Sequence, residues 1–295
     1  MLKHILVVGS AGQLGHALRA ARGEFNEFRF TFWERADLDI SVESWVLERI
    51  AALKPDIVIN AGAYTNVERA EDDHEGAEAG NALAPGYLAK ACKSIQALLV
   101  HVSTDYVFDG GLNRPYTEED LPQPLNYYGL SKLKGERSID AVFDHYYIIR
   151  TSWLYGAFGH NFYNTMLRLA KERGELSVVN DQFASPTWAG LLAQDILSML
   201  HRKYYESVSI PCGLYHYTHE GTASWWDFAR AIMDVHGLNV PVHAVDSARF
   251  PTKAKRPSYS KLDITKWKNA TGLNTCSWQE ALQRMVNPQA PSNPE

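Results

Sequence analysis

The chain opens with a short strand-like run that leads directly into a glycine-rich turn. Residues 4–8 are mostly apolar, Gly9-Ser-Ala-Gly12-Gln-Leu-Gly15 follows them, and a helix is expected near 13–22. Unpaired amides at a helix N-terminus form a ready site for a pyrophosphate, and glycines let the backbone approach it. A tight turn with no ligand is the alternative. The position after a strand and before a helix favours a dinucleotide site.

The first half of the chain repeats this alternation of strands and helices. After the first strand, strand patterns occur at 29–33, 56–60, 97–103 and 146–150. Helical patterns lie between them, from Ser41 to Pro55, from about 76 to 93 and from 128 to 142. Strands separated by helices of this length predict an α/β fold, a doubly wound parallel Rossmann sheet with right-handed crossovers.

The rhythm becomes irregular after about Thr151. Helices are expected at 162–173 and 191–201, strands at 176–180 and 213–218, and two capping-box patterns begin helices at Ser224 and Ser277. We therefore predict a dinucleotide-binding Rossmann domain at 1–152, joined by the strand and helix around 176–202. Residues 153–286 are predicted to form mainly a smaller α/β substrate-binding domain, interleaved with the first. The proline-rich end, 287–295, is predicted to be a flexible tail.

The composition excludes several classes of protein. A net charge of −5 over 295 residues gives no electrostatic reason to bind nucleic acid or an anionic membrane. No apolar stretch approaches the ~20 residues that a membrane span requires, so a cytoplasmic location is expected. The three cysteines lie far apart, and the histidines show no ligand spacing. No metal site is predicted.

A tyrosine and a lysine four residues apart suggest a proton donor. Tyr128 and Lys132 fall in the helix predicted at 128–142, where residues four apart are side-chain neighbours. A cation beside a phenol lowers the phenol's pKa, which would let Tyr128 pass a proton near neutral pH. Thr104 closes the fourth strand and would add a second hydrogen-bond donor for a carbonyl oxygen. Downstream of the glycine turn, the three residues point to carbonyl–alcohol redox chemistry with a nicotinamide cofactor.

The residues after the second strand bear on the choice of cofactor. Glu34 lies where an acid would hold the ribose hydroxyls of NADH, whereas the adjacent Arg35 would accept the 2′-phosphate of NADPH. Asp39 and Ile40 follow, near the expected adenine edge, although Asp39 is also explained as a solvated loop acid. Both NADPH and NADH stay open, with a slight preference for NADPH.

Two further segments are candidates for binding. The run from Asn60 to Thr65 closes the third strand with small residues, which either line the ligand crevice of an α/β sheet or pack against a helix. Residues 253–268 carry six basic residues against one acid, and Arg256 is the best candidate there for binding a diphosphate. Trp225 and Trp226 are expected in the core.

Taken together, these motifs resemble the extended short-chain dehydrogenase/reductases, and within them the dTDP-4-dehydrorhamnose reductase family. The string Ser-Thr-Asp-Tyr-Val-Phe-Asp-Gly at 103–110 is the most specific part. The resemblance extends to about residue 262 and also rests on residues 9–15, 60–65, 67–71, 124–129, 150–153, 180–182, 186–187 and 256–257. It implies NAD(P)H-dependent reduction of the C4 ketone of dTDP-4-dehydro-6-deoxy-L-mannose (dTDP-4-dehydro-L-rhamnose) to dTDP-L-rhamnose.

The resemblance also implies roles for single residues. Thr104, Tyr128 and Lys132 would be catalytic, and Asp105, Tyr106 and Trp153 would contact the sugar together with Thr104. With the residues proposed above, the predicted cofactor contacts, beside Tyr128 and Lys132, are Gly9, Gly12, Gln13, Leu14, Gly15, Glu34, Arg35, Asp39, Ile40, Ala61, Ala63, Tyr64 and Thr65.

Other classes of function stay open at this point. Another nucleotide-sugar 4-ketoreductase or an epimerase would use the same motifs. A dehydratase is disfavoured, because related dehydratases carry an Asp-Glu pair after the threonine, whereas Asp105 is followed here by Tyr106. A non-catalytic subunit like the methionine adenosyltransferase regulatory subunit is a third reading. A homodimer is compatible with such a sheet, and His16 replaces an acid that holds magnesium at a dimer contact in some family members.

Overall fold

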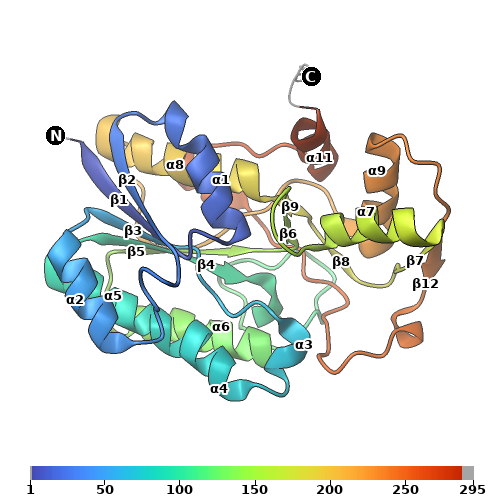
Figure 1. Cartoon of the computed structure of the whole chain (residues 1–295), viewed down its shortest axis with the longest axis horizontal. Helices are drawn as coiled ribbons and strands as arrows, with labels where there is room; N and C mark the ends of the chain where they lie inside the picture. The colour runs from blue at the N-terminus through green and yellow to red at the C-terminus, as the bar shows by residue number, and fades with distance from the viewer. Residues whose placement is uncertain (1, 288–295) are drawn as a thin grey trace.

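A six-stranded parallel sheet forms the centre of the protein in the computed structural model, which describes residues 2–287 (Figure 1). The strand order is β10-β5-β4-β3-β1-β2, and every neighbouring pair is parallel. The strands are β1 (Lys3–Val8), β2 (Phe28–Trp33), β3 (Ile57–Asn60), β4 (Leu98–Thr104), β5 (Tyr146–Thr151) and β10 (Gly213–His216). This arrangement confirms the predicted doubly wound α/β fold.

Helices cover both faces of the sheet, and this accounts for the apolar strands. All residues of β3 and β5 are buried, as expected of strands covered on both sides. Helices α1 (Gln13–Ala21) and α8 (Ala189–Tyr205) share one core with the sheet, above it in Figure 1. Helices α2 (Glu43–Leu53), α5 (Ala84–Ile95) and α6 (Tyr127–Asp140) lie on the opposite side, and α2 and α5 contribute buried residues to the core there.

The strand order reverses between β1 and β3. From β1 the chain moves outward to β2, then crosses back to β3 on the other side of β1 and continues through β4 and β5. The loops after β1 and β3 therefore leave the sheet in opposite directions, and a crevice opens between them at the carboxyl ends of the strands. This position is the expected place for a ligand in an open α/β sheet.

A second core lies beside the sheet and is built mainly from the C-terminal half. Helices α7 (Phe162–Arg173), α9 (Trp225–Val235) and α11 (Trp278–Val286) bury apolar side chains there together with β7 (Leu176–Val179). Short strand pairs complete this part: β7 with β12 (Val242–Val245), β8 (Phe183–Ala184) with β11 (Ala223–Ser224), and β6 (Leu154–Tyr155) with β9 (Thr187–Trp188).

The prediction that the strand near 176 joins the Rossmann sheet is wrong. β7 pairs with β12, and the strand that extends the sheet beyond β5 is β10. The helix of that region, α8, does pack in the first core. A strand pattern reveals that a segment is extended, but its partner depends on which sheet edge is free, and sequence periodicity does not encode this. The division into two domains stays a prediction.

The helix predicted at 76–93 has three parts. Helix α4 (His74–Ala77) passes into a π-helical segment, η2 (Glu78–Leu83), before α5 begins. The remaining elements are two short helices, α3 (Val67–Ala70) and α10 (Thr265–Thr271), and three 3₁₀ turns, η1 (Arg22–Glu24), η3 (Asp105–Val107) and η4 (Ser247–Arg249).

Within residues 2–287, no helix is both long enough and apolar enough to cross a membrane. From residue 288 on, the predicted flexible tail lies outside the described residues.

Candidate active site

The glycine turn after β1 lies against the loop after β3. Gly9 has a φ of +74°, and a Cβ on it would lie 2.4 Å from the backbone of Gly62. A Cβ on Gly15 would lie 2.4 Å from Ser10, within the turn itself. Both glycines are therefore required by the close approach of backbones, and the approach of Gly9 to Gly62 brings the two loops of the crevice together.

The N-terminus of α1 fits a pyrophosphate. Gly12 is its N-cap residue and supplies no capping side chain, and its first turn holds no acidic residue. The amides that begin α1 thus have no side-chain acceptor, and the positive end of the helix dipole faces the crevice side of the sheet. Gly12, Gln13 and Leu14 lie at the start of α1, where backbone N–H groups suit an anionic ligand, and their contact with a dinucleotide stays a prediction.

A loop from the second half of the chain contacts this turn. The carboxamide of Asn161, the N-cap residue of α7, donates to Gln13 Oε1 at 2.9 Å and to the carbonyl of Gly156. The ring of Phe158 stacks on His16, with centroids 4.7 Å apart. The loop from the second half of the chain therefore engages Gln13 Oε1, at the start of α1.

The residues that bear on cofactor choice follow β2 directly. The chain leaves β2 next to the glycine turn, where Ser10 N donates to Trp33 O. Glu34 and Arg35 are exposed, and Arg35 forms an ion pair with Asp39 at 3.1 Å. The Asp39 carboxylate also accepts hydrogen bonds from Ser41, and these keep the pKa of Asp39 below its usual value. Asp39 is thus a structural acceptor of its own loop, while Arg35 is held nearby.

The loop after β3 is held by a residue that the sequence did not single out. Asn81, in the π-helical segment η2, accepts from Tyr64 N and donates to Tyr64 O, both at 2.9 Å. Its carboxamide also donates to Ser131 Oγ on α6. The extra residue of a π-turn redirects a helical side chain, and such turns occur often at functional sites. Asn81 therefore fixes the segment containing Ala63, Tyr64 and Thr65 relative to α6.

The turn after β4 presents three of the predicted substrate residues. The Thr104 hydroxyl accepts from Tyr106 N at 3.2 Å and donates to Asp105 Oδ1 at 3.2 Å. The other Asp105 oxygen accepts from the hydroxyl of buried Ser260, 155 residues further along the chain. Burial raises the pKa of Asp105 to about 7, although both hydroxyls oppose this rise. The charge of this carboxyl group therefore changes near neutral pH.

Helix α6 approaches this turn closely. Asn126 caps the helix by accepting from Gly129 N, and its amide donates to Lys255 O in the basic segment. A Cβ on Gly129 would lie 2.1 Å from Tyr106 O, so only glycine fits at position 129, directly after Tyr128. The contact brings the Tyr128 ring to 6.1 Å from that of Tyr106, in an edge-to-face arrangement.

Tyr128 is placed beside Thr104, as predicted, but its electrostatics differ from the prediction. Burial raises the pKa of Tyr128 to about 12, the nearby Thr104 hydroxyl lowers this pKa, and the Asp105 charge raises it. The expectation that Lys132 lowers this pKa is wrong, because burial, Thr104 and Asp105 set it. Lys132 Nζ donates to Val102 O at 2.7 Å instead, and Lys132 is itself buried, with 2% of its surface exposed. Burial lowers the pKa of Lys132 to about 8.

Arg256 and Trp153 lie on the side formed by the second half of the chain. Arg256 forms an ion pair with Glu68 at 2.6 Å, and it lies close enough to Tyr106 to oppose the rise in the pKa of Tyr106 that burial causes. Trp153 follows β5 with a φ of +46°, a strained conformation for a large residue, and its ring stacks on Trp225 at 3.4 Å. Trp225 packs on the second core, as expected, and thereby supports Trp153.

Comparisons with known proteins identify the family. The family model described as the RmlD substrate binding domain matches residues 3–290. The chain belongs to this family. A dTDP-4-dehydrorhamnose reductase from Aggregatibacter actinomycetemcomitans is 40% identical over 290 residues, which cover 96% of this chain and 98% of that protein. The resemblance inferred from the motifs is confirmed.

Two solved structures of this family superpose over nearly the whole chain. A dTDP-4-dehydrorhamnose reductase from Clostridium acetobutylicum has a TM-score of 0.90 and 38% identity, covering 97% of this chain and 99% of that one. The enzyme from Bacillus anthracis, solved in complex with NADP, has a TM-score of 0.90 and 36% identity, covering 98% and 100%. The solved structures therefore agree with the sequence comparison on both the fold and the family of this chain.

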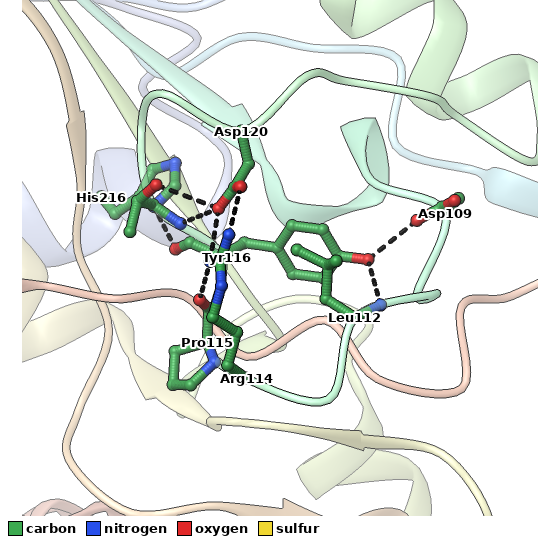
Figure 2. A network of polar contacts seen from close by, with 8 residues as sticks. Asp109, Leu112, Arg114, Pro115, Tyr116, Asp120 and His216 are labelled. Carbon is green, nitrogen blue, oxygen red and sulfur yellow. Dashed lines mark hydrogen bonds and ion pairs between the residues drawn. The ribbon is translucent and has the colours of Figure 1, made fainter.

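The end of the family's most specific string has a structural role. Asp109 Oδ1 accepts from the Tyr116 hydroxyl at 2.8 Å, and Leu112 N donates to the same hydroxyl (Figure 2). Asp120 in turn forms an ion pair with Arg114. Tyr116 also makes a backbone bridge to Leu262, two residues from Ser260. The string therefore provides Thr104, Asp105 and Tyr106 at its start and an anchor for the Ser260 segment at its end.

Some residues that shape this site carry no signal that sequence reasoning used. Ser260 and Asn81 act across 155 and 50 residues of chain, and nothing local distinguishes them from surface polar residues. Asn126 was within reach of sequence reasoning, because an asparagine just before a helix is a preferred N-cap residue. Within residues 2–287, no group of three or more His, Cys, Asp or Glu is arranged to hold a metal ion.

Proposed function

We propose that this protein catalyses the NAD(P)H-dependent reduction of the C4 ketone of dTDP-4-dehydro-6-deoxy-L-mannose to dTDP-L-rhamnose. Membership of the family, the curated relatives' names and the NADP complex of a relative support this proposal. The uncapped start of α1 is suited to the cofactor's pyrophosphate. When bound, the reduced nicotinamide supplies a hydride for the carbonyl carbon.

In this proposal Tyr128 donates the proton. A phenol with a pKa of about 12 is protonated at neutral pH, so Tyr128 is ready to give a proton to the oxygen that becomes an alkoxide. The observation that carries the proposal is the position of Tyr128 beside Thr104, where α6 meets the turn after β4, in a chain that matches the family over nearly its whole length. Thr104 lies beside Tyr128 and would donate a hydrogen bond to the same oxygen.

The remaining predicted residues would bind the two ligands. Asp105, Tyr106 and Trp153 would contact the sugar. Arg256, which pairs with Glu68 in the structure, would bind the substrate diphosphate instead. Lys132 would contact the nicotinamide ribose, and Arg35 would favour NADPH. A cytoplasmic location, a homodimer and the absence of a metal stay predictions from the sequence.

The test uses the purified full chain with NADPH and a dTDP-4-keto-6-deoxy-L-sugar, followed at 340 nm. Tyr128→Phe is expected to lose about 10²–10⁴-fold in kcat, the usual value of a positioned proton donor, with the Kd for NADPH little changed. Tyr127→Phe is the matched control, because it removes a neighbouring phenol hydroxyl that donates to Glu78.

The outcome separates the alternatives. Stoichiometric loss of NADPH supports a reductase, whereas conversion of the sugar without net loss of NADPH identifies an epimerase. No conversion of any 4-keto nucleotide-sugar in a panel with NADPH and NADH would favour the non-catalytic reading. Full activity of Tyr128→Phe would remove Tyr128 from the mechanism.

A further inference from the structure

Trp153 has a backbone conformation that its place in the chain does not explain. Within residues 2–287, four non-glycine residues have a positive φ: Lys54, Gln96, Trp153 and Ser207. Lys54 and Gln96 are the C-cap residues of α2 and α5, and Ser207 follows the C-cap residue of α8. A left-handed residue is ordinary where a helix ends. Trp153 instead joins β5 to β6, so its φ of +46° must be held by contacts with other segments.

The main contact of the Trp153 ring is made by Trp225, the first residue of α9. The two indole rings lie almost parallel, with centroids 3.4 Å apart and planes that differ by 8°. The backbone is tied down as well, because the carbonyl of Trp153 accepts from Thr187 N at 3.3 Å. No ligand fits between rings that are this close. One face of Trp153 is therefore covered, and only the opposite face and the ring edge are left for a ligand.

Trp225 is itself held from several directions. Its Nε1 donates to Gln182 Oε1 at 3.2 Å, and the ring of Phe162 lies against it with centroids 4.5 Å apart. Its backbone is fixed too, because Ser224 and Asp227 form a capping box around the first turn of α9. These contacts come from three separate segments of the second half of the chain. The indole of Trp225 therefore cannot turn away from Trp153 without breaking them.

We propose that Trp225 is a positioning residue for the nucleotide-sugar, which holds Trp153 in its left-handed conformation and fixes the face of that ring that the sugar meets. This inference deepens the proposed function and rests on it, because the contact between Trp153 and the sugar is part of that proposal. Both tryptophans are only half-buried, so the stack lies at the edge of the second core. Aromatic side chains at such an edge can line a ligand site and fix the ligand's orientation.

Trp226 provides a matched control within the same turn of helix. It follows Trp225 directly, is also half-buried and also packs on the second core. Its Nε1 donates to Val242 O at 2.8 Å, and the guanidinium of Arg230 lies over its ring at 4.8 Å. Trp226→Leu therefore removes the same kind of side chain from the same core without touching the stack.

The first test detects the stack without any turnover. Two stacked indoles couple electronically and give an exciton couplet in the far-ultraviolet circular dichroism spectrum of the full chain. Trp225→Leu and Trp153→Leu should each remove the same couplet, because it requires both rings, whereas Trp226→Leu should keep it. A couplet that survives both of the first two changes would show that the rings do not stack in solution, and would overturn the proposal.

The second test is a double-mutant cycle on the KM for a dTDP-4-keto-6-deoxy-L-sugar, with saturating NADPH. Trp225→Leu should raise this KM by about 3–10-fold, the factor that one aromatic pair provides, with kcat and the Kd for NADPH little changed. Trp225→Phe keeps a ring for the stack and should recover most of the loss. In a Trp153→Leu background, Trp225→Leu should have no further effect, because the side chain that it positions is then absent.

The outcomes separate this proposal from a structural role and from the proposed function. An equal effect of Trp225→Leu in both backgrounds, or an equal rise in KM for Trp226→Leu, would show that Trp225 acts only through the second core. If Trp225→Leu does not fold, Gln182→Leu replaces it in the cycle and should raise the KM by about 2–5-fold, as for one lost hydrogen bond. A wild-type protein that does not oxidise NADPH would refute the proposed function, whereas an active wild type with an additive cycle refutes only the role of Trp225.

Discussion

Gly129 offers a sharp test of how the backbone positions the proton donor. A methyl group at this position would lie 2.1 Å from Tyr106 O and 3.1 Å from Pro124 Cβ. Both neighbours are backbone or proline atoms, which do not rotate away as a flexible side chain would. In Gly129→Ala the start of α6 must therefore move away from the turn after β4 by about 1 Å before the overlap is relieved.

Two quantities follow from this displacement. Overpacking of this kind costs about 1–3 kcal/mol of unfolding free energy, of which the better helix propensity of alanine returns about 1 kcal/mol. Because Tyr128 precedes Gly129, the phenol moves with the helix relative to Thr104. A misplacement of about 1 Å at a reacting group costs about 10²-fold in rate. We expect kcat to fall by this factor while the protein still folds.

The assay compares urea unfolding with NADPH oxidation at 340 nm. Gly135→Ala is the matched control, because its methyl group would lie 2.0 Å from Asn81 O on the same helix but further from the phenol. It should cost similar stability, and because it moves Asn81 rather than Tyr128, it should weaken NADPH binding while kcat at saturating NADPH stays near the wild-type value. Gly23→Ala, with nothing within 4 Å, should change neither stability nor activity. Wild-type kcat in a folded Gly129→Ala would refute the link between this contact and catalysis.

Three further predictions concern charged groups. Arg256→Ala should raise the KM for the nucleotide-sugar by about 10–100-fold, as for a lost charge-assisted contact, whereas Lys253→Ala, whose ammonium pairs with Asp72 at the surface, should not. Arg35→Ala should move the ratio of kcat/KM values for NADPH and NADH toward NADH, and an unmoved ratio contradicts its role. Asp105 binds its proton more tightly in the folded protein, with a pKa of about 7 against 3.8, so its contribution to stability falls as the pH rises from about 4 to 7. In urea titrations, the unfolding free energy of Asp105→Asn minus that of the wild type should therefore be larger at pH 8 than at pH 5. An equal difference at both pH values would show that the raised pKa of Asp105 does not affect stability.

Much of the fold could be predicted because it depends on local patterns. The turn at 9–15 and the alternation of strands and helices predict a parallel sheet, and the structure has one with the strand reversal next to Gly9. Helical spacing placed Tyr128 and Lys132 on one helix, α6. The pairing of β7 with β12 was missed, because the choice of a strand's partner depends on distant segments.

The sequence by itself determined the parallel sheet, the crevice at its switch point and the residue types that reach it, because periodicity and turn chemistry act over a few residues. Only the tertiary structure decided the charges in that crevice. Tyr128 has a raised pKa and Lys132 a lowered one, because the folded chain removes both from water and brings Val102 and His101 to the amine from about 30 residues away. Desolvation and contacts between distant segments set a pKa, and neither is written in the spacing of the motif.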